Sequence, residues 1–162
     1  MATPKFTKSI QPSLLDRLID NEPHNRQEGS VSRAESLRQF RMGVKRDLEW
    51  LLNTTCAPIE VPEPCAEARK SLLFFGLPDL SSVTLQDPGD EKQLMRSLEE
   101  VIEKFEPRLA HARVTGREPY RSGVQALTFH IEAVLMIDPA PERISFDTVL
   151  EITKGAYSVK EG

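Results

Sequence analysis

The chain contains little cysteine, and this scarcity argues against two classes of small protein. Its two cysteines, Cys56 and Cys65, flank the proline-rich loop APIEVPEP in a chain of 162 residues. A disulfide scaffold needs more cysteines, and a cytosolic setting disfavours a single bridge, so we expect plain thiols. The histidines His24, His111 and His130 are scattered, whereas a structural metal site needs several ligands at close spacing. We therefore expect neither a metal nor a cofactor.

Long apolar runs are also missing. The longest candidate, ALTFHIEAVLMI, is interrupted by His130 and Glu132 and falls well short of the roughly 20 residues of a membrane span. The beginning, MATPKFTKSIQPS, lacks the apolar segment of a secretory signal. The formal net charge of -4 gives no support to binding of nucleic acid or of an anionic membrane. We expect one cytosolic domain with modest extras.

Recognisable catalytic motifs are absent from the sequence. It has no phosphate-binding glycine loop, nucleophile elbow or zinc-binding helix motif. The best catalytic alternative is a paired-carboxylate hydrolase, because Glu99, Glu100, Glu103 and Glu106 crowd the end of one predicted helix. Such an enzyme keeps one carboxyl group protonated, whereas the neighbouring Arg108 favours the charged form of Glu106. Aromatic residues form only 6% of the chain, so few rings are available to stack on sugars. No catalytic residue is predicted.

The first predicted element is a short amphipathic segment, QPSLLDRLID, with Leu14, Leu15 and Leu18 on one side. The polar stretch NEPHNRQEGSVS follows it, so residues 1–31 are predicted to be this segment and a flexible linker. A short helix on a tether is marginal in water and needs a surface for its leucines. The segment either packs on its own domain or acts as a peg for a neighbouring subunit.

Two longer helices are predicted. Ser32 and Glu35 have the spacing of a capping box and open a helix from about Ala34 to Asn53. A third helical segment follows Asp90, a candidate cap, and ends before a proline. A brief helical run at AEARKSLLFFG lies between them, with a glycine as its C-cap. The first long helix carries a basic stripe, which is either a solvated face or a contact for an acidic partner: Arg38, Arg41 and Lys45.

Strand signals dominate the last third of the chain. RLAHARV is short and mixed, whereas ALTFHIEAVLMI and ISFDTVLEIT alternate apolar and polar residues. Their connections are too short for helical crossovers. We therefore predict an α+β fold with helices packed on one face of a small antiparallel three-stranded sheet. The predicted division is 1–31, a domain at 32–155, and a C-terminal tail at 156–162.

The join between the last helix and the first strand contains Glu106, Pro107 and Arg108. Proline ends the helix and forces a corner, with a carboxylate and a guanidinium on either side. This pair could be catalytic, an internal ion pair that holds the corner, or a docking feature for another protein. Because an exposed ion pair contributes only about 0–1 kcal/mol to folding, we favour docking.

Several segments occur in an order that resembles the TssE family of type VI secretion baseplate subunits, which is similar to the small wedge protein of contractile phage baseplates. They are PSLLDRLID, SLRQFRMGVKRDLEWLLNT, LLFFGLPDLSS, LEEVIEKFEPRL and ALTFHIEAVLMIDP. The resemblance extends from Pro12 to about Thr153. The chain departs from the family pattern at LLFFG, where a polar residue and a tyrosine are usual near Phe74 and Phe75.

The resemblance implies a structural role without catalysis. Such subunits contact TssF, TssG and TssK in the wedge and form the platform on which the TssB–TssC sheath starts, in the bacterial cytoplasm at the inner membrane. Their Glu-Pro-Arg motif, matched by residues 106–108, is implicated in subunit contacts. A meander leaves the first and third strands outside. We predict that the third, ISFDTVLEIT, including Val149 and Glu151, and the tail after it take part in pairing with a strand of a sheath subunit.

Two alternatives remain open at this stage. The phage relatives have been described as lysozyme-like, so the second reading is a peptidoglycan hydrolase. The third is a cytosolic adaptor that uses the N-terminal segment alone.

Overall fold

The computed structural model describes residues 10–19, 32–59, 61–79, 88–117, 126–151 and 156–162. The chain divides into two compact units, residues 1–44 and 45–162, and each is described by itself. The predicted linker NEPHNRQEGSVS lies outside the described residues, apart from its last residue, Ser32. The end of the predicted third strand, Ile152 and Thr153, also lies outside them.

Residues 1–44 contain α1 (Leu14–Leu18) and the first part of α2 (Arg33–Leu52). Ser13 caps α1, because its Oγ accepts a hydrogen bond of 3.2 Å from the backbone N–H of Asp16. Ser32 caps α2 in the same way, accepting one of 3.2 Å from Glu35 N–H. The cap predicted at Ser32 is therefore confirmed, and α2 ends within a residue of the predicted position.

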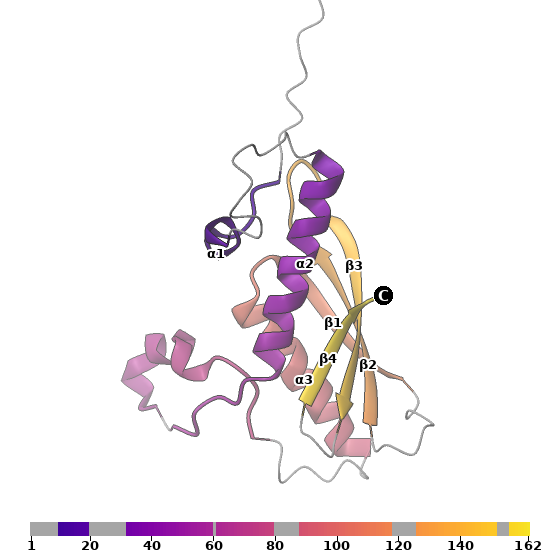
Figure 1. The fold of residues 1–162 in the computed structure, drawn as a ribbon. Coiled ribbons are helices and arrows are strands. Elements are labelled where there is room, and N and C mark those ends of the chain that lie inside the picture. Colours follow the sequence, from indigo (N-terminus) through magenta and orange to yellow (C-terminus); the bar gives the residue numbers. More distant parts are fainter. Residues whose placement is uncertain (1–9, 20–31, 60, 80–87, 118–125, 152–155) are drawn as a thin grey trace, which may run out of the picture. The chain divides into compact units, whose positions relative to one another are not determined.

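Residues 45–162 contain the remaining elements, shown in Figure 1. After α2 come two 3-10 helices in the region of the predicted helical run, η1 (Glu63–Lys70) and η2 (Leu72–Phe74). Helix α3 spans Pro88–Phe105, so Asp90 lies in its first turn and is not its cap. Four strands follow: β1 (Leu109–Arg117), β2 (Ala126–Leu135), β3 (Glu142–Glu151) and β4 (Ala156–Glu161).

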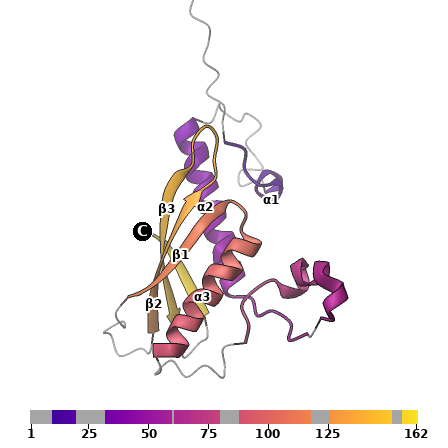
Figure 2. The ribbon, with the colours of Figure 1, turned by 180° about the vertical axis from the view of Figure 1, so that it is seen from behind.

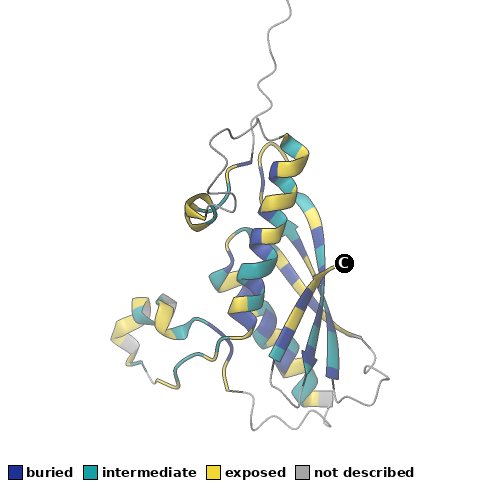
Figure 3. Ribbon diagram, in the orientation of Figure 1, coloured by how far each residue is buried: buried dark blue, intermediate teal, exposed yellow. Residues whose placement is uncertain are grey.

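The strands form one antiparallel sheet in the order β1-β2-β3-β4. Figure 2 shows α3 beside β1 on one face of this sheet. Figure 3 shows buried positions alternating with less buried ones along the strands. The core of this unit is aliphatic and aromatic, and its most buried members include Leu98, Ile102, Phe129, Ile131 and Phe146. The predicted α+β class is confirmed.

The sheet has a fourth strand where the sequence analysis expects only a tail. Tyr157 and Val159 of β4 are buried, and Ser158 and Lys160 between and beyond them are exposed. This alternation is the period-2 pattern of a half-buried strand. With six residues and only two buried side chains, this strand was too short to be recognised from the sequence.

The fourth strand changes the position of β3 in the sheet. Val149 lies opposite Thr128 of β2 on one side and Ser158 of β4 on the other. Glu151 likewise lies opposite residues of both strands. The prediction that the third strand is an open edge is therefore wrong, and the edges of the sheet are β1 and β4.

The hydroxyls of Thr148 and Tyr157 are buried in this unit without a hydrogen-bond partner among the described residues. The Thr148 side chain is buried, and its Oγ1 has no hydrogen-bond partner among the described residues. Replacing it by the similarly shaped valine removes an unsatisfied hydroxyl, so Thr148→Val should raise the free energy of unfolding by about 1 kcal/mol. Urea denaturation measures this change.

The matched control is Thr115→Val on the exposed side of β1, where Thr115 Oγ1 donates only a long hydrogen bond of 3.4 Å to His130 O. We expect that control to leave stability within about 0.5 kcal/mol of the original. A destabilised Thr148→Val variant would show that the hydroxyl contributes to the core.

Candidate functional site

The corner after α3 is built around an internal ion pair. Glu106 is the first residue past the helix, and its N–H still donates to Ile102 O at 2.9 Å. Its carboxylate is only 5% exposed and accepts hydrogen bonds from Arg108 N–H at 3.2 Å and Arg108 Nε at 2.6 Å. Arg108 Nη2 contacts the second carboxylate oxygen. Both oxygens of Glu106 are thus engaged by one residue, as in a bidentate pair.

Arg108 also joins this corner to the end of α2. Its Nη2 donates to Asp47 Oδ2 at 2.7 Å. Asp47 Oδ1 in turn accepts from Arg46 Nε at 2.9 Å and Arg46 Nη2 at 2.7 Å. The Arg46 guanidinium lies over the Trp50 ring, 5.1 Å from its centroid. We call Glu106, Arg108, Asp47 and Arg46 the corner network.

The neighbours of Arg108 in the corner network keep its guanidinium positively charged. Burial alone would lower the pKa of Arg108, but its hydrogen bonds to Glu106 and Asp47 and their negative charges raise that pKa above its ordinary value. The guanidinium therefore stays charged, and Glu106 is held as its partner. Of the roles considered for Glu106 and Arg108, the internal ion pair is the one that the geometry shows. Pro107, between them, is exposed.

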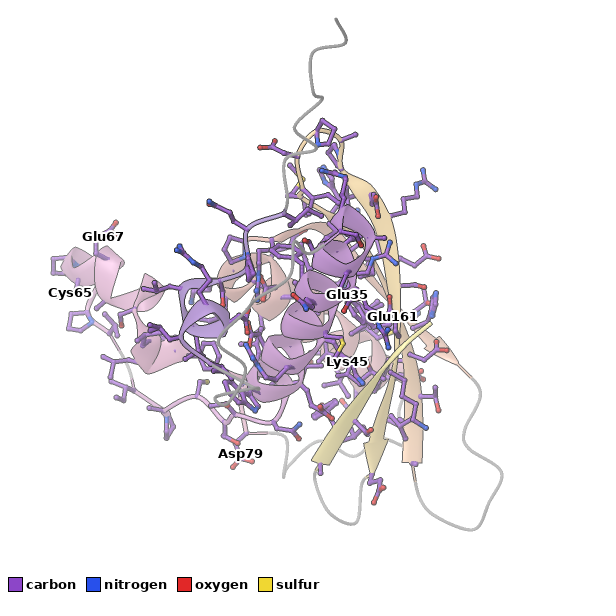
Figure 4. The ribbon with its side chains drawn as sticks, turned by 45° about the horizontal axis from the view of Figure 1, so that its top comes forward. Glu35, Lys45, Cys65, Glu67, Asp79 and Glu161 are labelled. Atoms are coloured by element: carbon purple, nitrogen blue, oxygen red, sulfur yellow. The ribbon has the colours of Figure 1, made fainter. Side chains whose placement is uncertain are left out.

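A second anchor holds the 3-10 segment near the same helix end. Phe75 packs edge-to-face on Phe105, with ring centroids 5.4 Å apart. Lys104 Nζ lies 5.4 Å from the centroid of Phe74. The aromatic residues of LLFFG therefore pack against the end of α3. Earlier in the chain, exposed Cys65 lies in η1, away from α3 (Figure 4).

Gly76, which follows Phe75, has a φ of 107°, a backbone conformation that favours glycine. Leu77 N–H then donates to Thr54 O at 2.8 Å, and Cys56 N–H donates to Leu77 O at 2.8 Å. These bonds close the loop between α2 and the 3-10 segment. The glycine is thus needed for a close approach of two backbones.

The predicted N-terminal contact residues are on the surface. Leu14 and Leu18 are 71% and 74% exposed, and Leu15 is also exposed. Within the same unit, Asp16 lies against Gly43 of α2, where an added Cβ would be 2.9 Å from Asp16 Oδ2. The leucines therefore face outward from α1 and are not covered by the described residues.

The basic stripe on α2 is less uniform than predicted. Arg38 is exposed, whereas Arg41 and Lys45 are partly buried. Arg38 is the member most accessible to a partner.

Both edges of the sheet receive side chains from helices, which sequence reasoning missed. At β4, the side-chain amide of Asn53 exchanges two hydrogen bonds with the backbone of Tyr157. At β1, Val114 N–H donates to Glu99 Oε1 at 2.9 Å. No pattern in the sequence indicates these contacts, because each joins residues on two different elements, 15 residues apart at β1 and 104 at β4.

The described residues contain no group of three or more His, Cys, Asp or Glu side chains that could hold a metal ion. In the same part of the chain, none of the helices combines the length and apolarity that crossing a membrane requires. Residues 45–162 thus offer a charged corner and two sheet edges that side chains cover in part. In the other unit, α1 carries exposed leucines.

Comparison with known proteins shows the family of this chain. Residues 38–140 match the family described as baseplate wedge protein gp25, and the chain belongs to this family. The predicted role as a structural component of a baseplate is confirmed at the level of the family. A solved structure titled "The baseplate complex from the type VI secretion system" includes a chain that is 24% identical, with a TM-score of 0.47, over 69% of this chain and 94% of that chain. A search of curated proteins finds no match.

Proposed function

We propose that this chain is the small wedge subunit of a type VI secretion baseplate, and that it acts without catalysis. The observation that carries the proposal is the match of residues 38–140 to the baseplate wedge family. The ordered set of TssE-like segments in the sequence supports the type VI assignment. On this proposal the chain binds TssF, TssG and TssK and supports the first TssB–TssC sheath subunits, in the bacterial cytoplasm at the inner membrane.

In this role, the corner network holds the turn after α3 in one conformation. Glu106 and Arg108 fix the corner from inside, so Pro107 is presented at a rigid, exposed turn. We propose that a wedge partner docks against this turn, with Arg108 contributing its remaining exposed surface, 21% of the side chain. The exposed Arg38, with Arg41 and Lys45, provides a basic contact for an acidic partner surface.

A sheath-assembly experiment tests the proposed function. A strain with its type VI genes intact except for this chain should form no TssB–TssC sheaths, observed by fluorescence of labelled TssB. Returning the full chain should restore them. Normal sheath formation in the absence of the chain would contradict the proposal.

The α1 leucines give a separate prediction. Because Leu14 and Leu18 are exposed, Leu14→Ser/Leu18→Ser should change the free energy of unfolding by less than about 0.5 kcal/mol. If α1 is a peg that inserts into a neighbouring subunit, that subunit buries both leucines. Losing them should then weaken co-purification with the wedge subunits at least roughly tenfold.

Arg17→Ser is the matched control for that experiment, because Arg17 is exposed on the same short helix. Unchanged co-purification of the double leucine variant would reject the peg. Complete loss of every partner upon deletion of the first twenty residues would instead favour an adaptor that uses this segment alone.

The enzymatic alternative is tested by release of soluble fragments from purified cell walls. With both Glu106 oxygens bound to Arg108, we expect no release above background, and the same result for Glu106→Gln. Digestion by the original chain that the substitution abolishes would establish a hydrolase.

A further inference from the structure

The short 3-10 helix η2 displays two adjacent leucines to solvent. Leu72 is 82% exposed and Leu73 is 52% exposed. Phe74, which follows them, is only partly buried. Isolated apolar residues are normal on a protein surface, whereas adjacent ones are typical of sites where another protein binds. This turn therefore offers an apolar surface that the described residues leave open.

The turn that carries the leucines is held by its own hydrogen bonds. Leu73 N–H donates to Ser71 Oγ at 3.4 Å, and Phe74 N–H donates to Ser71 O at 3.1 Å. Leu73 O accepts a bond of 3.3 Å from Ala57 N–H. Strand addition requires free backbone donors and acceptors, so a partner contacts this turn through side chains. A turn that is already fixed also loses little conformational entropy when it binds.

A lysine from the end of α3 lies beside this apolar surface. Lys104 Nζ is 5.4 Å from the ring centroid of Phe74 and 4.8 Å from that of Phe105, so two aromatic rings hold the ammonium. Glu100, one turn earlier on α3, has the spacing of a helical ion pair. Among the described residues, however, no carboxylate forms an ion pair with Lys104. The charge is thus fixed in position and open to a carboxylate from outside.

We propose that an amphipathic helix of another protein binds a surface that we call the η2 platform: Leu72, Leu73, Phe74, Phe105 and Lys104. Apolar residues of that helix, three or four positions apart, cover the leucines, and a carboxylate on the same helix pairs with the lysine. The inference rests on the proposed function for the identity of the partner, a wedge subunit. The η2 platform shares no residue with the corner network or with the edges of the sheet.

The charges around the η2 platform favour this occupant over a polyanion. Glu100 and Glu103 are exposed on the same helix as Lys104. Their charges would repel a nucleic acid or an acidic membrane surface. A single carboxylate set among apolar side chains can reach the lysine without that repulsion. The platform is therefore complementary to a protein helix that carries few acidic residues.

Nuclear magnetic resonance of the full chain tests the fixed lysine without any partner. Ring currents of Phe74 and Phe105 should move the ε-methylene protons of Lys104 upfield of those of Lys92, which is exposed on the same helix. Phe74→Leu should reduce this shift. Coincident resonances for the two lysines would overturn the held ammonium.

Binding to a purified TssF–TssG complex, measured by biolayer interferometry, tests the leucines. Leu72→Ser/Leu73→Ser should weaken binding at least about tenfold, because it removes two anchors from the centre of the contact. The single change Leu72→Ser, at the more exposed position, should weaken binding at least about threefold and leaves the fold intact. Leu72→Met/Leu73→Met is the matched control. It keeps the surface apolar and should bind like the original chain.

The same measurement tests the charge. Lys104→Glu places a like charge against the partner's carboxylate and should weaken binding at least about tenfold. Lys92→Glu changes the net charge of the chain by the same amount on the same helix, and it should bind within about twofold of the original.

The outcomes separate this inference from the proposed function. Unchanged binding by Leu72→Ser/Leu73→Ser would overturn the η2 platform, although the chain would remain a wedge subunit. Equal binding by Lys104→Glu and Lys92→Glu would overturn the acidic helix as its occupant. Failure of the original chain to bind TssF–TssG would instead reject the proposed function, and the platform with it.

Discussion

Replacing Arg108 by alanine is expected to lower the free energy of unfolding by about 3–5 kcal/mol, because it leaves a buried carboxylate without its partner. Glu106 is 5% exposed in its side chain, and Arg108 provides its hydrogen bonds from Nε and Nη2. The substitution also removes the bond to Asp47 that ties the corner to α2. Chemical denaturation followed by circular dichroism measures the loss.

Arg113→Ala is the matched control for this prediction. Arg113 is an arginine on β1 whose side chain is 78% exposed and lies 3.8 Å from the Glu99 carboxylate. We expect that change to cost no more than about 1 kcal/mol. The double variant Glu106→Leu/Arg108→Leu should recover much of the lost stability, since no buried charge remains unpaired.

The size of the Arg108→Ala effect also separates the two roles of the corner. A loss below about 1 kcal/mol, with failed assembly, would mean that Arg108 acts only by docking. A large loss means that the ion pair holds the fold, and docking is then tested at Pro107 instead.

Gly76→Ala is expected to lower the free energy of unfolding by about 3 kcal/mol. A Cβ at this position would lie 2.2 Å from Thr54 O and 2.7 Å from Thr54 C, both backbone atoms that cannot rotate away. The φ of 107° is a further strain for any residue with a side chain. In a chain of this size, the melting temperature should fall by about 6–12 °C.

Gly116→Ala is the control for that experiment. There the nearest atom to an added Cβ is Glu91 Oε1 at 2.3 Å, the end of a flexible side chain. We expect a change of no more than about 1 kcal/mol, because the carboxylate can move aside. Equal losses at both glycines would show that the approach of Leu77 to Thr54 contributes little.

The fold class was predictable because its elements follow the spacing of apolar residues. The stripe of α2 and the alternation of β2 and β3 each extend over enough residues to be recognised. β4 has six residues with only two buried side chains, and its place in the sheet comes from pairing with β3. Missing this strand led directly to the incorrect assignment of β3 as an edge.

The candidate site was predictable only where its residues are neighbours in the sequence. Glu106 and Arg108 flank a proline, and an internal ion pair was one of the three roles that the sequence left open for them, although docking was favoured. Asp47 completes that pair from 61 residues away, and Asn53 meets Tyr157 across 104 residues. Such contacts depend on how the sheet and helices pack, and a single sequence carries no pattern that reports them.

The most direct test of the account is the mass of the complex that this chain forms with TssF and TssG. The three proteins, produced together and purified through a tag on TssG, are measured by light scattering after size-exclusion chromatography. We predict one species whose mass includes this chain. Elution of the chain as a free monomer, beside a complete TssF–TssG complex, would contradict its role as a wedge subunit.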